Sequence, residues 1–223
     1  MATQLSQSPK RGRGRPPGFD RATALQQALK LFWERGYEGT SFDELTAAMG
    51  ISPSSFYNAF GSKEQLFQEA AEAYMAAAGE WFRRELGTDT DTRTAFHRLL
   101  STAVREFTRG DRPAGCMVSL ACTQVPPALE SLREMMAGHR RAAETAMAER
   151  IRLGIAAGDV PADADPEALA AFYSAVSRGL AVLARDGASR ERLQETVDIA
   201  MRAWPAAPAR ATPRPRRGKP AAR

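Results

Sequence analysis

The 223-residue chain contains two cysteines, two histidines and no uninterrupted apolar run of the roughly 18 residues that a membrane span needs. So few cysteines argue against the disulfide framework of a small secreted protein. The N-terminus is basic, but no apolar stretch follows it, so it does not resemble a secretion signal. We therefore expect a protein of the cytoplasm with no membrane contact.

The sequence also lacks the short motifs of common enzymes. No GxSxG, HExxH or P-loop string is present. Two histidines leave little acid–base capacity near neutral pH. The spacing of Cys116 and Cys122 does not place them on one face of a helix, and zinc sites usually show closer pairs with histidines. We expect no catalytic residue, cofactor or metal, and a redox role for these cysteines stays open.

What the sequence does contain is helical periodicity. Hydrophobic residues make up 43% of the chain, enough for a globular protein, and no strand-like alternation appears. The spacing of apolar residues and of capping residues predicts an all-α protein of about nine helices. Their expected ranges are 20–35, 41–50, 52–60, 62–86, 92–108, 115–124, 126–157, 165–184 and 189–204.

The second and third of these helices are short and lie close together. Ser41 with Glu44 fits a capping box, and Gly50 suits the end of the helix because glycine turns easily through positive φ. Ser52 can cap the next helix, with Pro53 at its first position. This order of short helix, tight turn and short helix is the layout of a helix-turn-helix DNA-binding motif.

The second helix of the motif has two different faces. Phe56 and Phe60 are four residues apart and are expected to face inward. The outward face then carries small or polar side chains: Pro53, Ser54, Ser55, Tyr57, Asn58 and Ala59.

The motif is followed by the pattern YxxFxSKExLF, formed by Tyr57, Phe60, Ser62, Lys63, Glu64, Leu66 and Phe67. This pattern resembles the signature of the tetracycline-repressor (TetR) family of bacterial one-component regulators, over about residues 20–72. The resemblance implies an N-terminal three-helix helix-turn-helix head and a C-terminal helical domain for ligand binding and dimerisation. It also implies a transcriptional regulator, commonly a repressor that a small molecule releases from a palindromic operator. The chain departs from the family at Thr46, where alanine is usual, and at Ala59, where histidine is frequent.

The motif suggests which residues contact double-stranded DNA. The Asn58 amide can pair with adenine, and short side chains can contact thymine methyls, bases or phosphates. The resemblance implies a phosphate contact for Tyr57, and helix N-termini favour anions. The predicted contacts of the folded head are Thr40, Ser41, Pro53, Ser54, Ser55, Tyr57, Asn58 and Lys63.

Two basic segments flank a mildly acidic body. Residues 1–19 add four positive charges and residues 205–223 add six, while the whole chain has a net charge of +5. Arg13 and Arg15 lie in a Gly-Arg-Gly-Arg-Pro stretch that is thin enough to enter a minor groove. These segments leave an alternative open: a DNA-architectural protein that binds broadly through its basic tails.

These features predict a domain order and two further functional surfaces. We expect a basic arm (1–19), a DNA-binding domain (20–63), an effector-binding and dimerisation domain (64–204) and a basic tail (205–223). An unidentified small, mainly apolar effector would bind among bulky side chains, and the resemblance implies a homodimer formed by the last two helices. The effector candidates are Trp81, Phe82, Phe96, Phe107, Met117, Leu120, Met135, Met136 and Phe172. The dimer candidates are Leu169, Tyr173, Val176, Leu180, Leu193, Val197 and Trp204.

Overall fold

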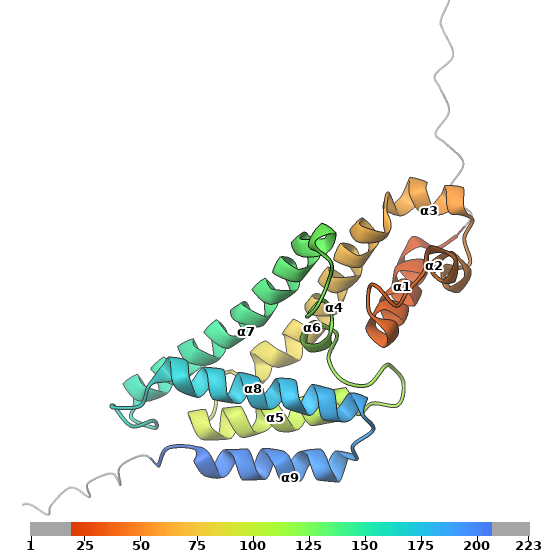
Figure 1. The fold of residues 1–223 in the computed structure, drawn as a ribbon. Helices are drawn as coiled ribbons and strands as arrows, with labels where there is room; N and C mark the ends of the chain where they lie inside the picture. The colour runs from red at the N-terminus through yellow and green to blue at the C-terminus, as the bar shows by residue number, and fades with distance from the viewer. Residues whose placement is uncertain (1–18, 207–223) are drawn as a thin grey trace, which may run out of the picture. The chain divides into compact units, whose positions relative to one another are not determined.

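The computed structural model describes residues 19–206, which form two compact units divided between Tyr74 and Met75 (Figure 1). This described part contains nine α-helices, two 3₁₀ turns and no strand, so the prediction of an all-α protein is confirmed. The helices are α1 (Arg21–Arg35), α2 (Phe42–Met49), α3 (Pro53–Phe60), α4 (Lys63–Glu85), α5 (Thr92–Phe107), α6 (Met117–Leu120), α7 (Glu130–Ala157), α8 (Pro166–Arg185) and α9 (Arg190–Ala200).

The first unit consists of α1, α2, α3 and the first half of α4. Its core is aromatic: Phe32 of α1 meets the edge of Phe67 of α4, with ring centroids 5.1 Å apart. Trp33 and Tyr74 form a second such pair at 4.9 Å. Because these pairs tie α4 to α1, the compact unit extends past residue 63, where sequence analysis placed the end of the DNA-binding domain.

The second unit is built around α8, which packs against α5, α6, α7 and α9. Tyr173 of α8 is fully buried in this core, and its ring lies 5.3 Å from both Phe96 and Trp204. Burial raises the pKa of the Tyr173 hydroxyl to about 12.

Helix α8 also has the length and composition of a membrane span, and it is the only such helix within residues 19–206. The sequence contains no uninterrupted apolar run here, because Ser174 and Arg178 lie within the segment. One third of its most apolar window is buried in the unit. The packing of α8 against four other helices accounts for this buried part, whereas Phe172 and Val182 are apolar residues that remain exposed.

Three helix boundaries differ from the predicted ones. The segment 115–124 is helical only over α6, since Ala121 is extended and Cys122 has a positive φ of 53°. The segment after Pro126 begins as a 3₁₀ turn, Pro127–Leu129, a common helix start. The last helix ends at Ala200 and continues as the 3₁₀ turn Met201–Ala203, after which Trp204 is extended because Pro205 follows it.

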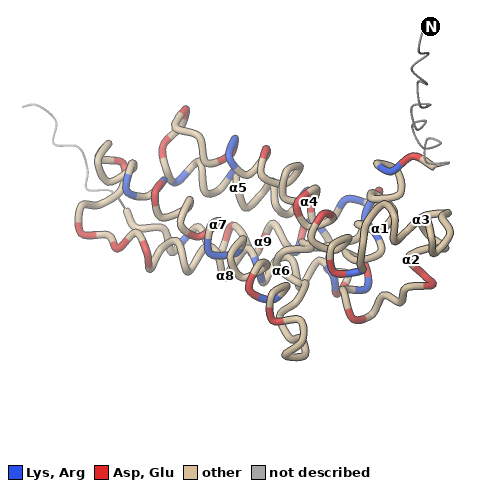
Figure 2. Tube along the Cα trace, turned by 90° about the horizontal axis from the view of Figure 1, so that it is seen from above, with Lys and Arg blue, Asp and Glu red and all other residues tan. Residues whose placement is uncertain are grey.

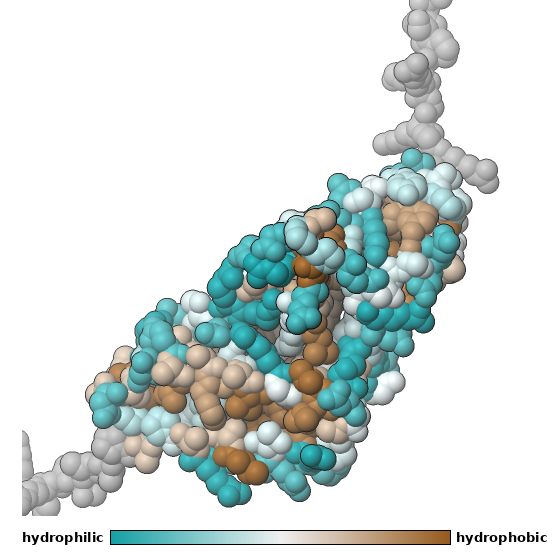
Figure 3. Space-filling view, in the orientation of Figure 1, coloured by the Kyte–Doolittle hydropathy of each residue, from teal (hydrophilic) through white to brown (hydrophobic). Residues whose placement is uncertain are grey.

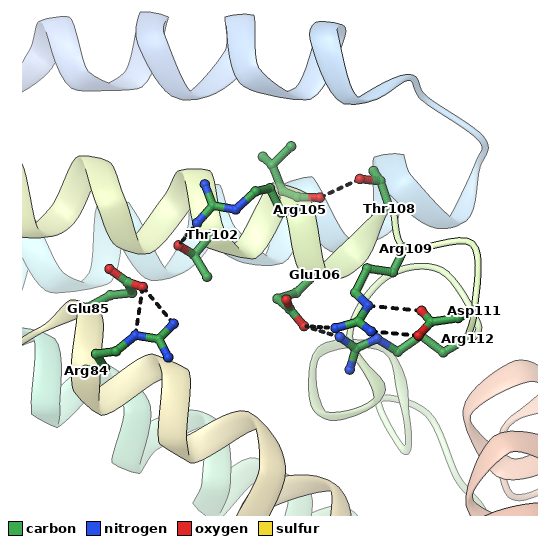
Figure 4. Close-up of polar contacts among 10 residues, drawn as sticks. Arg84, Glu85, Thr102, Arg105, Glu106, Thr108, Arg109, Asp111 and Arg112 are labelled. Atoms are coloured by element: carbon green, nitrogen blue, oxygen red, sulfur yellow. Dashed lines mark hydrogen bonds and ion pairs between the residues drawn. The ribbon is translucent and has the colours of Figure 1, made fainter.

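Charged residues secure the loops of the second unit. Glu106 at the end of α5 forms ion pairs with both Arg109 and Arg112 of the following loop, and Arg109 also binds Asp111 at 2.6 Å (Figure 4). Gly115 then brings the loop so close to α8 that a β-carbon would lie 2.6 Å from the Ala181 carbonyl oxygen. This loop is thus fixed at both ends.

A buried polar cluster joins the start of α5 to the end of α7. Arg150 is 5% exposed and donates to the Thr92 hydroxyl at 2.6 Å and to the carbonyl oxygens of Thr90 and Gly87. The Asp159 carboxylate accepts from the Thr92 N–H and hydroxyl. The buried guanidinium is therefore surrounded by acceptors, as its desolvation requires.

This cluster predicts an unequal response of two glycines in α7. Gly154→Ala should lower the free energy of unfolding by about 2 kcal/mol, because a β-carbon would crowd Thr92 and lie 2.6 Å from Asp159 Oδ1. Gly138→Ala is the matched control: a β-carbon there meets nothing within 4 Å. It should stabilise the protein by about 0.5–1 kcal/mol. Denaturant titration followed by circular dichroism measures both, and equal effects would contradict the prediction.

Candidate DNA-binding site

The helix-turn-helix motif forms as its capping residues predict. The Ser41 hydroxyl accepts from the Glu44 N–H, and the Glu44 carboxylate accepts from the Ser41 N–H at 2.8 Å. These bonds to Ser41, helped by Arg35, lower the pKa of Glu44. Gly50 takes the left-handed conformation (φ 66°, ψ 32°) and turns the chain towards α3. The capping box and the glycine turn are confirmed.

Helix α3 has one face buried in the head and an opposite face that is exposed to solvent. Phe56 is fully buried and Phe60 is 3% exposed, whereas Tyr57 is 56% exposed and Pro53, Ser54 and Asn58 are also exposed. Ser55 and Ala59 are half-buried. The helix carries no charged residue, so its trace is tan throughout (Figure 2). It therefore offers DNA hydrogen-bonding groups and methyl groups rather than charge.

The serines of α3 are bonded to one another. The Ser52 hydroxyl caps the helix by accepting from the Ser55 N–H at 3.2 Å, and it lies 3.0 Å from the hydroxyls of both Ser54 and Ser55. Asn58, in contrast, has no side-chain hydrogen bond to any described residue. Its amide is thus available for a base edge without breaking a bond inside residues 19–206.

The ring of Tyr57 is held by a residue that sequence analysis missed. Phe42, in the first turn of α2, stacks on Tyr57 with centroids 5.3 Å apart and an angle of 20° between the planes. Phe42 also meets the edge of the buried Phe56 ring at 4.8 Å. This places an exposed hydroxyl on a rigid aromatic support. The sequence signal was an aromatic residue at the first position of α2, directly after the capping serine.

The remaining predicted contacts of the head all lie near helix N-termini, but one of them is buried. Ser41 is exposed at the start of α2. Lys63 begins α4, and its ammonium lies 4.2 Å from the centre of the Tyr37 ring, where burial lowers its pKa. Thr40 is fully buried, and its hydroxyl donates to the Gly36 carbonyl oxygen at 2.7 Å. The prediction of a phosphate contact by the Thr40 side chain is therefore wrong.

Thr46 and the two arginines of the N-terminal arm differ in what the structure shows of them. The Thr46 hydroxyl donates to the carbonyl oxygens of Phe42 and Asp43, which explains how α2 tolerates it. Arg13 and Arg15 lie outside the described residues, so their contacts stay predictions.

Several residues predicted to form the dimer surface are part of the core of a single chain. Leu169 and Val176 are half-buried, while the others are at most 7% exposed. For these buried residues the prediction is wrong, because the periodicity that marks an apolar stripe does not say which partner covers it. The buried members are Tyr173, Leu180, Leu193, Val197 and Trp204.

The effector candidates do not share one environment. Phe96 and Phe107 are buried in the core of the second unit, and Trp81 and Phe82 pack against that core. Met117 and Met136 are buried, and Leu120 and Met135 are half-buried. Phe172 is 43% exposed, so it does not belong to an interior pocket of the monomer. An open surface hollow of about 360 Å³ is lined by residues 91, 93, 159, 201, 202 and 204–206, none of them among the effector candidates.

Among the described residues, no group of three or more His, Cys, Asp or Glu side chains is placed to hold a metal ion. The two cysteines form no disulfide; Cys122 is buried and Cys116 is half-buried.

A capped, anchored α3 with a polar exposed face, preceded by α2 and a glycine turn, defines the class of helix-turn-helix DNA-binding regulators. A family model for bacterial regulatory proteins of the tetR family matches residues 24–70, and one for the tetracyclin repressor-like C-terminal domain matches residues 95–200. The chain belongs to the tetR family of bacterial regulatory proteins.

Similar proteins agree with this assignment. The HTH-type transcriptional repressor ComR of Escherichia coli (strain K12) is 32% identical over 206 residues, which cover 92% of this chain and 98% of ComR. The repressor BdcR of the same strain is 31% identical over 187 residues, covering 84% and 90%. A cysteine mutant of the TetR family regulator CifR, complexed with 26bp double-strand operator DNA, is 46% identical with a TM-score of 0.83, covering 86% of this chain and all of that one.

The family membership confirms three predictions from the sequence: the TetR resemblance, the DNA-binding transcriptional regulator and the expectation that the protein is not an enzyme. The particular DNA contacts are not tested by these comparisons and stay predictions.

The stack of Phe42 on Tyr57 predicts coupled effects on DNA binding. Tyr57→Phe should weaken binding about tenfold by removing one hydrogen bond, with unchanged stability because the tyrosine is exposed. Phe42→Leu should weaken binding in the wild-type background but have little further effect in the Tyr57→Phe background, since it acts through the position of the hydroxyl. Fluorescence anisotropy with labelled duplex measures the cycle. Fully additive losses would show that Phe42 acts independently of Tyr57.

Proposed function

We propose that this protein is a homodimeric transcriptional repressor of the cytoplasm, released from a palindromic operator by a small, mainly apolar effector. One observation carries the proposal: α3 exposes Tyr57 and Asn58 above the buried Phe56 and Phe60. A helix held in this way can enter a groove without losing its own support. ComR and BdcR are transcriptional repressors, and CifR is complexed with operator DNA. These similarities support a repressor that binds an operator.

The size of α3 suits a major groove. An α-helix with its side chains is about 10–12 Å across, similar to the groove width, and most of the eight residues of α3 have short side chains. With the N-terminal end leading, Asn58 pairs with adenine, and Ser54 and Pro53 contact bases or thymine methyls. Phosphates on either side are bound by Ser41, Tyr57 and Lys63, while Arg13 and Arg15 add minor-groove contacts. In this proposal phosphate contacts set the register and α3 reads the sequence.

One such helix gives few base contacts, so specific binding needs a second copy. The exposed face of α8 offers an apolar stripe for that copy: Phe172 and Val182 are 43% and 46% exposed, and a β-carbon on Gly179 would meet nothing within 4 Å. Figure 3 shows apolar residues gathered over α8 on the face towards the viewer. We define the α8 stripe as Ala168, Phe172, Ala175, Gly179 and Val182, all exposed.

The α8 stripe replaces the dimer surface expected from the sequence. Leu169 and Val176 are half-buried at its edges, and Ile199 of α9 is 61% exposed. Small residues along the stripe allow close approach of two helices, and the large exposed ones fill the space between them. We propose that a second chain of the same kind covers this face, because the face is apolar and specific DNA binding needs a second copy.

The effector must act by binding one state better than the other, since equal affinity for both shifts no population. Bulky and adaptable side chains of the second unit, among them Met117, Met135 and Met136, suit an apolar ligand. In this proposal the ligand favours a state of the dimer whose two α3 helices do not match the operator spacing.

The proposal predicts selective DNA binding that depends on Asn58. Duplexes selected from a random library should be near-palindromic and bound roughly 10³-fold more tightly than bulk DNA at fixed salt. Asn58→Ala should weaken binding to the selected duplex by about 1–3 kcal/mol and relax one position of each half-site. Gln27→Ala, which removes an exposed amide from α1, is the control and should have no effect.

Removal of residues 1–19 and 205–223 should weaken binding to the selected duplex and to bulk DNA by the same factor. The preference for the selected duplex is then preserved. The alternative, a DNA-architectural protein, predicts a different result. Such a protein would show no preference for any duplex and would lose nearly all DNA binding when the two tails are removed.

The α8 stripe predicts the oligomeric state. Val182→Glu should shift the protein to a monomer in analytical ultracentrifugation, because it places a charge in the apolar contact between two copies. Operator binding should fall at least tenfold at nanomolar protein, since two linked heads bind more tightly than one. Leu153→Glu, at a 54% exposed leucine of α7, is the control and should remain dimeric. A dimeric Val182→Glu protein would place the interface elsewhere.

A further inference from the structure

Arg21, the first residue of α1, contacts two other helices of the head. Its Nη2 donates to both carboxylate oxygens of Glu69 on α4, at 2.6 and 2.8 Å. The same nitrogen donates to the Ala59 carbonyl oxygen at 3.2 Å, and Nε does so at 3.4 Å. The guanidinium carbon lies 4.5 Å from the centre of the Phe60 ring. One side chain thus joins α1, the end of α3 and α4.

The contact with Ala59 matters because it is made at a helix end. The last carbonyl groups of a helix have no partner within it. In α3 the Tyr57 carbonyl accepts from the Gly61 N–H, and the Phe60 carbonyl accepts from the Ser62 N–H. Arg21 binds the Ala59 carbonyl between them, and its positive charge suits the negative end of the helix dipole.

The planar Arg21 guanidinium constrains both the direction and the length of its hydrogen bonds to Ala59 and Glu69. Nε and Nη2 both donate to the Ala59 carbonyl oxygen, Nη2 also donates to the Glu69 carboxylate, and the guanidinium lies over the Phe60 ring. A lysine ammonium keeps the charge but cannot make this planar arrangement. The buried Phe56 and Phe60 hold α3 against the core, and the Arg21 contact restrains the rotation and position of its C-terminal end.

We propose that Arg21, paired with Glu69, is a positioning residue for DNA recognition: it sets the orientation of α3 and thereby the sequence preference. This inference rests on the proposed role of α3 as the DNA-reading helix. Base readout depends on side chains held within about 0.5 Å of their productive geometry. A loosened end of α3 therefore reduces binding to the selected duplex more than binding to bulk DNA.

The test separates the effect of the Arg21 charge from the effect of its contact geometry, and it uses the full-length protein. Arg21→Lys keeps the charge, and Glu69→Gln removes a negative charge from the head. If Arg21 acts only as a cation, the first variant binds like wild type and the second binds all DNA more tightly. If Arg21 positions α3, both variants lose about tenfold in affinity for the selected duplex and stay within about twofold of wild type on bulk DNA.

Arg35→Ala is the matched control. Arg35 lies at the other end of α1 and forms an ion pair with Glu44 of similar exposure, but this pair does not involve α3. The control should change selected and bulk binding by the same factor. Circular dichroism melting of each variant checks that the head is folded, and a repeated selection with Arg21→Lys should return duplexes with a relaxed preference.

The outcomes separate the two proposals. A wild-type protein that shows no preferred duplex overturns the proposed function, and this inference with it. A selective wild-type protein whose Arg21→Lys variant keeps its preference overturns the positioning role alone. Parallel losses on selected and bulk DNA would also overturn it, because they would assign Arg21 a general electrostatic contact.

Discussion

The burial of Phe56 and Phe60 beneath α3 is the interaction on which the DNA-binding unit depends. An eight-residue helix is too short to be stable alone in water, so its stability has to come from packing. With both phenylalanines buried, the other side of α3 needs no protein partner. This division of one short helix into a buried side and an exposed side leaves a polar, uncharged surface on the DNA-binding unit.

The same division recurs in the second unit at α8. One side of this helix supplies Tyr173, Leu180 and Ala184 to the core, and the opposite side leaves Phe172 and Val182 exposed. Helix α8 is therefore apolar both on its buried side and on its exposed side. That is why α8 has the composition of a membrane span although it packs against four helices.

Local chemistry made much of the head predictable. The Ser41–Glu44 capping box, the Gly50 turn and the Ser52–Pro53 helix start depend on neighbouring residues only, and each formed where the sequence placed it. The errors arose where distant residues decide. Thr40 was assigned to the surface but faces inward, and the apolar stripes of α8 and α9 were assigned to a partner although Leu193 and Val197 complete the core of their own chain.

The sequence by itself determined the helical class, most helix ends and the DNA-reading motif, because caps, turns and apolar periodicity act over a few residues. Only the tertiary structure decided which apolar side chains remain exposed, that Phe42 supports Tyr57, and that Arg21 reaches Ala59 and Glu69. These contacts join residues far apart in the chain. Spacing along one helix cannot specify them, because the packing of several helices determines which faces meet.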